Sequence, residues 1–193
     1  MKGANIMQYN PDADVEKILF SAADIDTMVK RLGEEISLSY ASSDKDLLCV
    51  GMLNGAAIFF ADLVRHIETC PLVFDFMKVS SYGDGTESGG TINIERDIKA
   101  DVADKHVLLI EDIVDSGLTM SRILSHLRTL PQPPADVKLC ALLSKSARRQ
   151  TEVHIDYLGT EVPDEFLIGY GMDYAKKYRN LPYIGVLKRE VYA

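Results

Sequence analysis

The chain has 193 residues, of which 47% are hydrophobic and 26% charged, and its formal net charge is −8. This length suits one domain, residues 1–193, with a full core. The acidic balance argues against a nucleic-acid partner, because phosphate backbones are bound by clustered Lys and Arg. The longest charge-free stretch, Leu47 to Ala61, is too short to cross a bilayer, and residues 1–11 lack a cleavable hydrophobic leader. We therefore expect no membrane partner and a cytoplasmic location.

The cysteines and histidines show no metal-binding or disulfide pattern. The cysteines are Cys49, Cys70 and Cys140, and the histidines are His66, His106, His126 and His154. Three widely spaced cysteines predict small core residues in a reducing compartment. The histidines lack ligand spacing, so each is expected to be an ordinary surface or core residue.

The first half of the chain predicts a helix and then a strand–turn–helix unit. Residues 1–14 carry little pattern and are expected to form a loose arm. A helix is predicted from Ser21, because apolar residues from Ile25 to Ile36 recur at 3.6-residue spacing. The apolar run 46–53 predicts a strand, and a glycine turn then leads to a helix over 56–67.

Two further strands are predicted around a glycine-rich segment. Residues 72–82 and 91–98 have strand-like patterns, and residues 83–90 between them contain four glycines and no large apolar side chain. The residues alone fit a long hairpin and a lid that closes over a site equally well.

A buried strand over 107–110 is predicted next, followed by a helix over 119–130 that Pro131 ends. Further strands are predicted over 137–143, 155–159, 166–171 and 183–187. Strands that alternate with helices in this way indicate one α/β domain with a small appended lobe.

The residues between that strand and that helix carry the main functional signal. Glu111, Asp112 and Asp115 follow the apolar run at the sheet edge where open α/β folds bind ligands. Ser116, Gly117 and Thr119 then offer hydroxyls, backbone N–H groups and a helix N-terminus, which suit a phosphate. Turn chemistry alone explains one Asp before a glycine turn but not three carboxylates. A ribose 5-phosphate with Mg²⁺ needs both the carboxylates and the phosphate-binding turn.

The run from Glu111 to Thr119 resembles the phosphoribosyl pyrophosphate (PRPP) motif of type I phosphoribosyltransferases. Other stretches resemble the hypoxanthine–guanine phosphoribosyltransferases, namely 50–55, 75–77 with 80–83, 142–145, and 163–174 with 178–182. The last of these is absent from orotate, adenine and uracil enzymes. The resemblance implies the type I phosphoribosyltransferase fold, a mostly parallel twisted sheet flanked by helices. It also implies a small hood, built from the N-terminal part and the part after about residue 155.

The same resemblance implies a purine salvage enzyme. Such an enzyme transfers the 5-phosphoribosyl group from PRPP to N9 of hypoxanthine or guanine, giving IMP or GMP and pyrophosphate. The implied cofactor is Mg²⁺, the partners are PRPP and a purine base, and the assembly is a homodimer or homotetramer. The alternative is a regulator of the same fold that senses PRPP or nucleotides without catalysis. The acidic charge and the retained Asp115, Lys145, Asp173 and Arg179 weigh against this alternative.

The resemblance also implies roles for individual residues. Asp115 would act as general base or acid at purine N7, while Glu111 and Asp112 would bind the ribose hydroxyls and metal. Asp173 would hold Mg²⁺ bridged to the pyrophosphate and would also belong to the purine site. Ser116, Gly117, Leu118 and Thr119 would cradle the 5-phosphate, and Asp115, at the base of that loop, is part of the same PRPP motif. Lys145 would donate to the 6-oxo group, Phe166 would stack on the base, and the Leu167 backbone would meet the edge of the base.

Two loops complete the implied site. Leu53, Asn54, Gly55 and Arg179 would bind pyrophosphate, with a cis peptide between Leu53 and Asn54. Many relatives carry Lys where this chain has Asn54, so the loop lacks one positive charge. Ser81 and Tyr82 match the family's mobile loop, and this match favours the lid over a plain hairpin.

Overall fold

The computed structural model describes residues 10–68, 71–81 and 92–193. Its large sheet has six strands in the order β4-β3-β2-β5-β6-β7, and every pair is parallel except β3 with β4. The strands are β2 (Leu47–Leu53), β3 (Leu72–Ser81), β4 (Ile92–Arg96), β5 (His106–Val114), β6 (Asp136–Ser144) and β7 (Tyr157–Glu161). The predicted fold class, a mostly parallel sheet flanked by helices, is confirmed.

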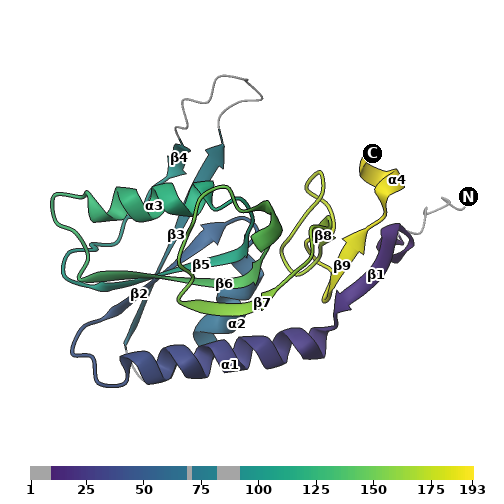
Figure 1. Ribbon diagram of the computed structural model, residues 1–193. Coiled ribbons are helices and arrows are strands. Elements are labelled where there is room, and N and C mark those ends of the chain that lie inside the picture. The colour runs from purple at the N-terminus through teal and green to yellow at the C-terminus, as the bar shows by residue number, and fades with distance from the viewer. Residues whose placement is uncertain (1–9, 69–70, 82–91) are drawn as a thin grey trace, which may run out of the picture.

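Helices cover both faces of this sheet (Figure 1). The helices are α1 (Ala22–Tyr40), α2 (Ala57–Leu63) and α3 (Leu118–Arg128), with short 3₁₀ turns η1 (Pro11–Asp14), η2 (Val64–His66) and η3 (Ser146–Arg148). The Ser21 side chain caps α1 by accepting from the Asp24 N–H, and Asp24 accepts from the Ser21 N–H in return. This reciprocal capping box explains why the helix begins where it does.

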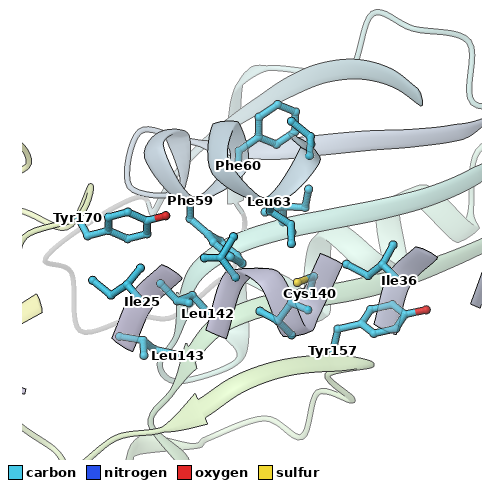
Figure 2. Packing of buried hydrophobic residues seen from close by; sticks show 14 of the residues in the cluster. Ile25, Ile36, Phe59, Phe60, Leu63, Cys140, Leu142, Leu143, Tyr157 and Tyr170 are labelled. Carbon is cyan, nitrogen blue, oxygen red and sulfur yellow. The ribbon is translucent and has the colours of Figure 1, made fainter. Parts of the chain in front are cut away.

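The main core lies between the sheet and the α1 and α2 side. Figure 2 shows side chains from α1, α2 and β6 meeting there, among them Ile25, Phe59 and Leu142. A second apolar cluster, which includes Ile123 and Leu127, packs α3 against the opposite face. Cys49 and Cys140 are buried, as expected for core residues, and Cys70 lies outside the described residues.

A small antiparallel sheet, β1-β9-β8, lies beyond the carboxyl ends of β5 and β6 (Figure 1). Its strands are β1 (Val15–Phe20), β9 (Ile184–Leu187) and β8 (Leu167–Ile168), and the short helix α4 (Arg189–Tyr192) follows β9. β7 belongs to the large sheet, so the C-terminal part of the small sheet begins after Glu161 and not near residue 155.

Three differences from the sequence-based expectation affect the site or its surroundings. β1 was not predicted, and η1 gives structure to residues 11–14 of the expected loose arm; residues 1–9 lie outside the described residues. β5 does not end at Ile110, because its ladder with β6 continues to the pairing of Val114 with Ser144. The carboxylates of Glu111 and Asp112 therefore project from the strand itself. Among the described residues, no helix is long and apolar enough to cross a membrane.

Candidate active site

A cavity of about 340 Å³ lies at the carboxyl ends of β5 and β6, against the small sheet. Its wall contains many of the residues singled out in the sequence: Gly55, Asp112, Asp115, Lys145, Phe166, Leu167, Asp173 and Arg179. These residues come from positions more than 120 apart in the chain. The fold therefore brings the acidic motif, the lysine and the C-terminal block into one site.

Two adjacent carboxyl groups form the most unusual electrostatic feature of the site. Asp112 is buried and lines the cavity, while Glu111 Oε2 is buried without a hydrogen-bond partner among the described residues. Burial raises the pKa of Glu111 well above its usual range, and the neighbouring Asp112 charge adds to the effect. Burial also raises the pKa of Asp112, against the stabilising backbone N–H of Ile113. Such a pair is poised to accept hydrogen bonds from ligand hydroxyls.

Asp115 has one engaged oxygen and one free oxygen. Its Oδ2 accepts a hydrogen bond from Arg148 Nη1 at 3.2 Å, and Arg148 also pairs with Asp164 at 3.6 Å. Its Oδ1 is buried and has no partner in the part of the chain that the structure describes. An unpartnered carboxylate oxygen at a cavity wall can accept a proton from a bound molecule.

The turn before α3 is held from below by the loop after β6. The Ser116 carbonyl accepts from the N–H groups of Gln150 at 2.9 Å and Thr151 at 3.1 Å. Gly117 has φ +81°, and a Cβ added there would lie 2.2 Å from the Thr151 carbonyl oxygen. Only glycine fits this position. The Leu118 N–H at the start of α3 donates to Ser116 Oγ at 3.4 Å, and a helix N-terminus of this kind suits an anion.

The loop after β2 lies close to the carboxylates and to the C-terminal block. The Leu53–Asn54 peptide bond is cis, as the family resemblance implies. A Cβ added at Gly55 would lie 2.0 Å from Asp112 Oδ2. Gly171 has φ +101°, and a Cβ there would lie 2.0 Å from the Gly55 carbonyl oxygen. Neither position has room for a side chain, so these two glycines let the C-terminal block approach the loop after β2 and let that loop approach the Asp112 carboxylate.

Arg179 ties the C-terminal block together. Its Nη1 donates to the Gly171 carbonyl at 2.5 Å, and its Nη2 lies 2.5 Å from Asp173 Oδ1. Asp173 Oδ2 accepts from the Lys176 N–H at 2.7 Å. Both residues line the cavity, which places a fork-shaped cation and a carboxylate side by side at its mouth.

Lys145 is a buried cation at the end of β6. It is only 6% exposed, and its backbone N–H donates to the Val114 carbonyl at 2.9 Å. Burial lowers the pKa of its ammonium group, although the nearby Asp115 charge acts in the opposite direction. A buried donor with few alternatives selects strongly for a ligand acceptor.

The chain matches known proteins over nearly its whole length. The profile of the phosphoribosyl transferase domain family matches residues 21–175. The hypoxanthine-guanine phosphoribosyltransferase of Bacillus subtilis is 46% identical over 179 residues, which are 93% of this chain and 97% of that protein. This chain belongs to the hypoxanthine-guanine phosphoribosyltransferase family.

Other comparisons agree with that family. A crystal structure of a hypoxanthine phosphoribosyltransferase from Staphylococcus aureus has a TM-score of 0.89 and 41% identity, covering 97% of this chain and 99% of that one. A bifunctional TilS/HprT protein from Listeria monocytogenes is 44% identical over 191 residues, which are 99% of this chain but 28% of that protein. The resemblance predicted from sequence is confirmed, and nothing supports the non-catalytic alternative.

Several predicted site residues of this phosphoribosyltransferase do not line the cavity. They are Glu111, Leu53, Asn54, Ser116, Gly117, Leu118 and Thr119. All lie within four positions of a lining residue, and the 116–119 turn begins beside the cavity residue Asp115. Ser81 is the last residue of β3, while Tyr82 lies outside the described residues, so the lid stays a prediction.

Three cavity residues were missed by sequence reasoning: Ile113, Arg148 and Met172. Arg148 is the most consequential, because it contacts the carboxylate expected to handle the proton. Its place in the site could have been predicted from its spacing to Lys145, since residues three apart on a helical turn lie on the same side. Ile113 and Met172 lay inside motifs that were already quoted, with no chemical cue of their own.

The expected Mg²⁺ was tested against the donors that the phosphoribosyltransferase chain offers. Among the described residues, no three His, Cys, Asp or Glu side chains converge as a ready cation site. The cavity instead has Asp112 on one element and Asp173 on another, with the Glu111 Oε2 atom unpartnered. This donor set fits Mg²⁺, which is usually held by one or two carboxylates together with substrate phosphates and waters.

Proposed function

We propose that this protein transfers the 5-phosphoribosyl group of PRPP to N9 of hypoxanthine or guanine, releasing pyrophosphate. The observation that carries the proposal is the single cavity shared by Asp112, Asp115, Lys145 and Arg179. One wall is acidic and suits ribose hydroxyls, one side holds a buried donor, and the mouth holds a fork-shaped cation. Few other ligands need all three.

In this proposal the purine lies between Lys145 and Phe166. The Lys145 ammonium donates to the 6-oxo group, the Phe166 ring stacks on the base, and the Leu167 backbone meets the edge of the base. Adenine has a 6-amino donor instead and would leave the buried lysine facing another donor. The site therefore selects 6-oxopurines.

The transfer breaks the bond between ribose C1 and the pyrophosphate oxygen and forms the bond between C1 and N9. The transition state is cation-like at the sugar, so Glu111 and Asp112 stabilise it while they hold the ribose hydroxyls. Asp115 Oδ1 takes the proton from N7 as N9 bonds. Arg179 and the backbone of 53–55 receive the departing pyrophosphate, and the 116–119 turn holds the 5-phosphate.

Mg²⁺ is the proposed cofactor, held by Asp173 and by Glu111 with Asp112. When bound, it supplies positive charge to the pyrophosphate group. The proposal also includes a cytoplasmic location, a lid that contains Ser81 and Tyr82, and a homodimer or homotetramer. The 52% exposed Phe74 on β3 supports self-association, because large exposed aromatic rings are enriched at interfaces.

The test is to incubate the protein with PRPP, Mg²⁺ and each of hypoxanthine, guanine, xanthine and adenine, and to measure nucleotide formation. Product with hypoxanthine or guanine supports the proposal, and product with adenine alone refutes the acceptor assignment. Asp115→Asn should lower turnover by about 10²–10⁴-fold, because a general base is removed. Asp44→Asn, a matched change at an exposed position, should leave turnover unchanged.

A further inference from the structure

The aromatic ring that lines the purine side of the cavity is itself packed between two tyrosines. Phe166 contacts Tyr174 edge-on, with ring centroids 5.5 Å apart and planes at 89°. It contacts Tyr192 of α4 with centroids 5.0 Å apart and planes at 31°. The two tyrosines also meet each other at 6.4 Å. Phe166 lines the cavity, whereas neither tyrosine does.

The two sides of the Phe166 ring have different surroundings. One side faces the cavity, where a ligand can bind, and the rest of the ring packs against Tyr174 edge-on and against the tilted face of Tyr192. Phenylalanine without such neighbours can turn about two side-chain torsions, and ordering it on binding costs conformational entropy. A ring already held in place binds a flat base with less of that cost.

The helix that carries Tyr192 is anchored independently of the cavity. Lys188 donates its backbone N–H to the Asp14 carbonyl at 2.9 Å and its ammonium to the Ala13 carbonyl at 2.6 Å. Val191 packs against the cluster of Ile168, Tyr178, Leu181 and Leu187. The start of α4 is therefore fixed to η1, and its last turn is fixed to the small sheet.

The ring of Tyr192 faces the aromatic group. Tyr192 is 38% exposed, and its ring contacts those of Phe166 and Tyr174. Tyr174 follows Asp173 directly, so the same ring group borders the carboxylate beside Arg179. The aromatic group thus connects the base wall with the neighbouring acidic residue.

We infer that Tyr192 is a positioning residue of the purine site, which fixes the plane of the Phe166 ring from outside the cavity. The inference rests on the proposed function, because it assigns the purine to Phe166. Tyr192 acts through Phe166 and does not touch the base. Its removal should weaken binding of the base while the sugar and phosphate contacts stay intact.

The experiment compares wild type with Tyr192→Ala, Tyr192→Phe and, as a matched control, Glu190→Ala on the exposed side of the same helix. Steady-state KM values are measured separately for hypoxanthine and PRPP, and Kd values for IMP and ribose 5-phosphate. Tyr192→Ala should raise the KM for base and the Kd for IMP by roughly three- to tenfold, the usual effect of one aromatic pair. The values for PRPP and ribose 5-phosphate should stay within about twofold. Tyr192→Phe should behave like wild type, because the contact is through the ring.

A double-mutant cycle separates positioning from general destabilisation. In a Phe166→Ala background, adding Tyr192→Ala should change the Kd for IMP by less than about twofold, since the ring through which Tyr192 acts is gone. An unchanged Kd for IMP in Tyr192→Ala alone overturns the inference, and so does an equal loss for IMP and ribose 5-phosphate. Failure of the wild-type protein to form a nucleotide from any purine refutes the proposed function instead.

Discussion

Replacing Glu111 by Gln should make the ligand-free protein more stable. Glu111 Oε2 is buried without a partner, and the carboxylate of Asp112 lies beside it. A buried, unsatisfied polar group costs about 1–3 kcal/mol, and more when it is charged. Glutamine keeps the shape, removes the charge, and offers an amide that can donate to Asp112.

The gain should depend on pH with a defined sign. The folded-state pKa of Glu111 lies well above the ordinary value of 4.5, so the folded protein binds more protons than the unfolded chain above that value. Through Glu111, wild type therefore loses stability as the pH rises from about 4.5 toward the folded-state pKa, and the variant lacks this contribution. The gain of the variant should be small near pH 5 and largest near pH 8.

Thermal and urea unfolding of wild type, Glu111→Gln and Glu34→Gln at pH 5 and pH 8 measure this effect. A gain of 1–3 kcal/mol corresponds to a midpoint increase of roughly 2–10 °C for a domain of this size. Glu34 is exposed on α1, so its variant should match wild type. Equal stability of Glu111→Gln and wild type at pH 8, or the same gain at both pH values, would refute the reasoning. The kcat/KM for PRPP should fall by about 10- to 100-fold, because a charged hydrogen-bond acceptor is lost.

Three further predictions concern other parts of the site. Lys145→Met should stabilise the protein at neutral pH, because burial disfavours the charged ammonium. It should also lower activity with 6-oxopurines by at least about 10²-fold. Unfolding and turnover measured on one preparation check the gain in stability and the loss of activity. Gly171→Ala should lower the unfolding free energy by at least about 2 kcal/mol, because φ is +101° and the new Cβ would overlap the Gly55 carbonyl; an unchanged urea midpoint would contradict this geometry. Removing divalent cations with EDTA should abolish transfer and Mg²⁺ should restore it. Mg²⁺ without pyrophosphate should leave the unfolding midpoint unchanged, since the described residues offer no preformed cluster of three ligands.

Sequence reasoning succeeded where the signal is contiguous. The acidic motif and the phosphate turn lie within nine residues, Glu111 to Thr119, and their spacing is set by one strand, one turn and one helix start. The same holds for the start of α1, which was predicted at Ser21 and is fixed by a capping box between residues three apart. Local chemistry of this kind is readable because the backbone geometry that it requires is local.

Elements held by distant partners were harder to predict. β1 has Glu16 and Lys17 within six residues, and it exists because it pairs with β9, from Val15 with Leu187 to Phe20 with Ile184. Strand formation of this kind depends on its neighbours more than on intrinsic preference. The ends of β5 were misplaced for the same reason, since the ladder with β6 carries acidic residues into the strand.

Close packing at two glycines joins the loop after β2 to the C-terminal block and to β5. Gly171 lies against the Gly55 carbonyl, and Gly55 lies against the Asp112 carboxylate, so neither position has room for a side chain. Arg179 then holds Gly171 from the other side. A loop fixed in this way by close backbone packing does not depend on a lysine for its shape. The Asn54 in this chain therefore removes a charge from the proposed pyrophosphate site without removing what positions the loop, and Arg179 is left as the cation of that part of the cavity wall.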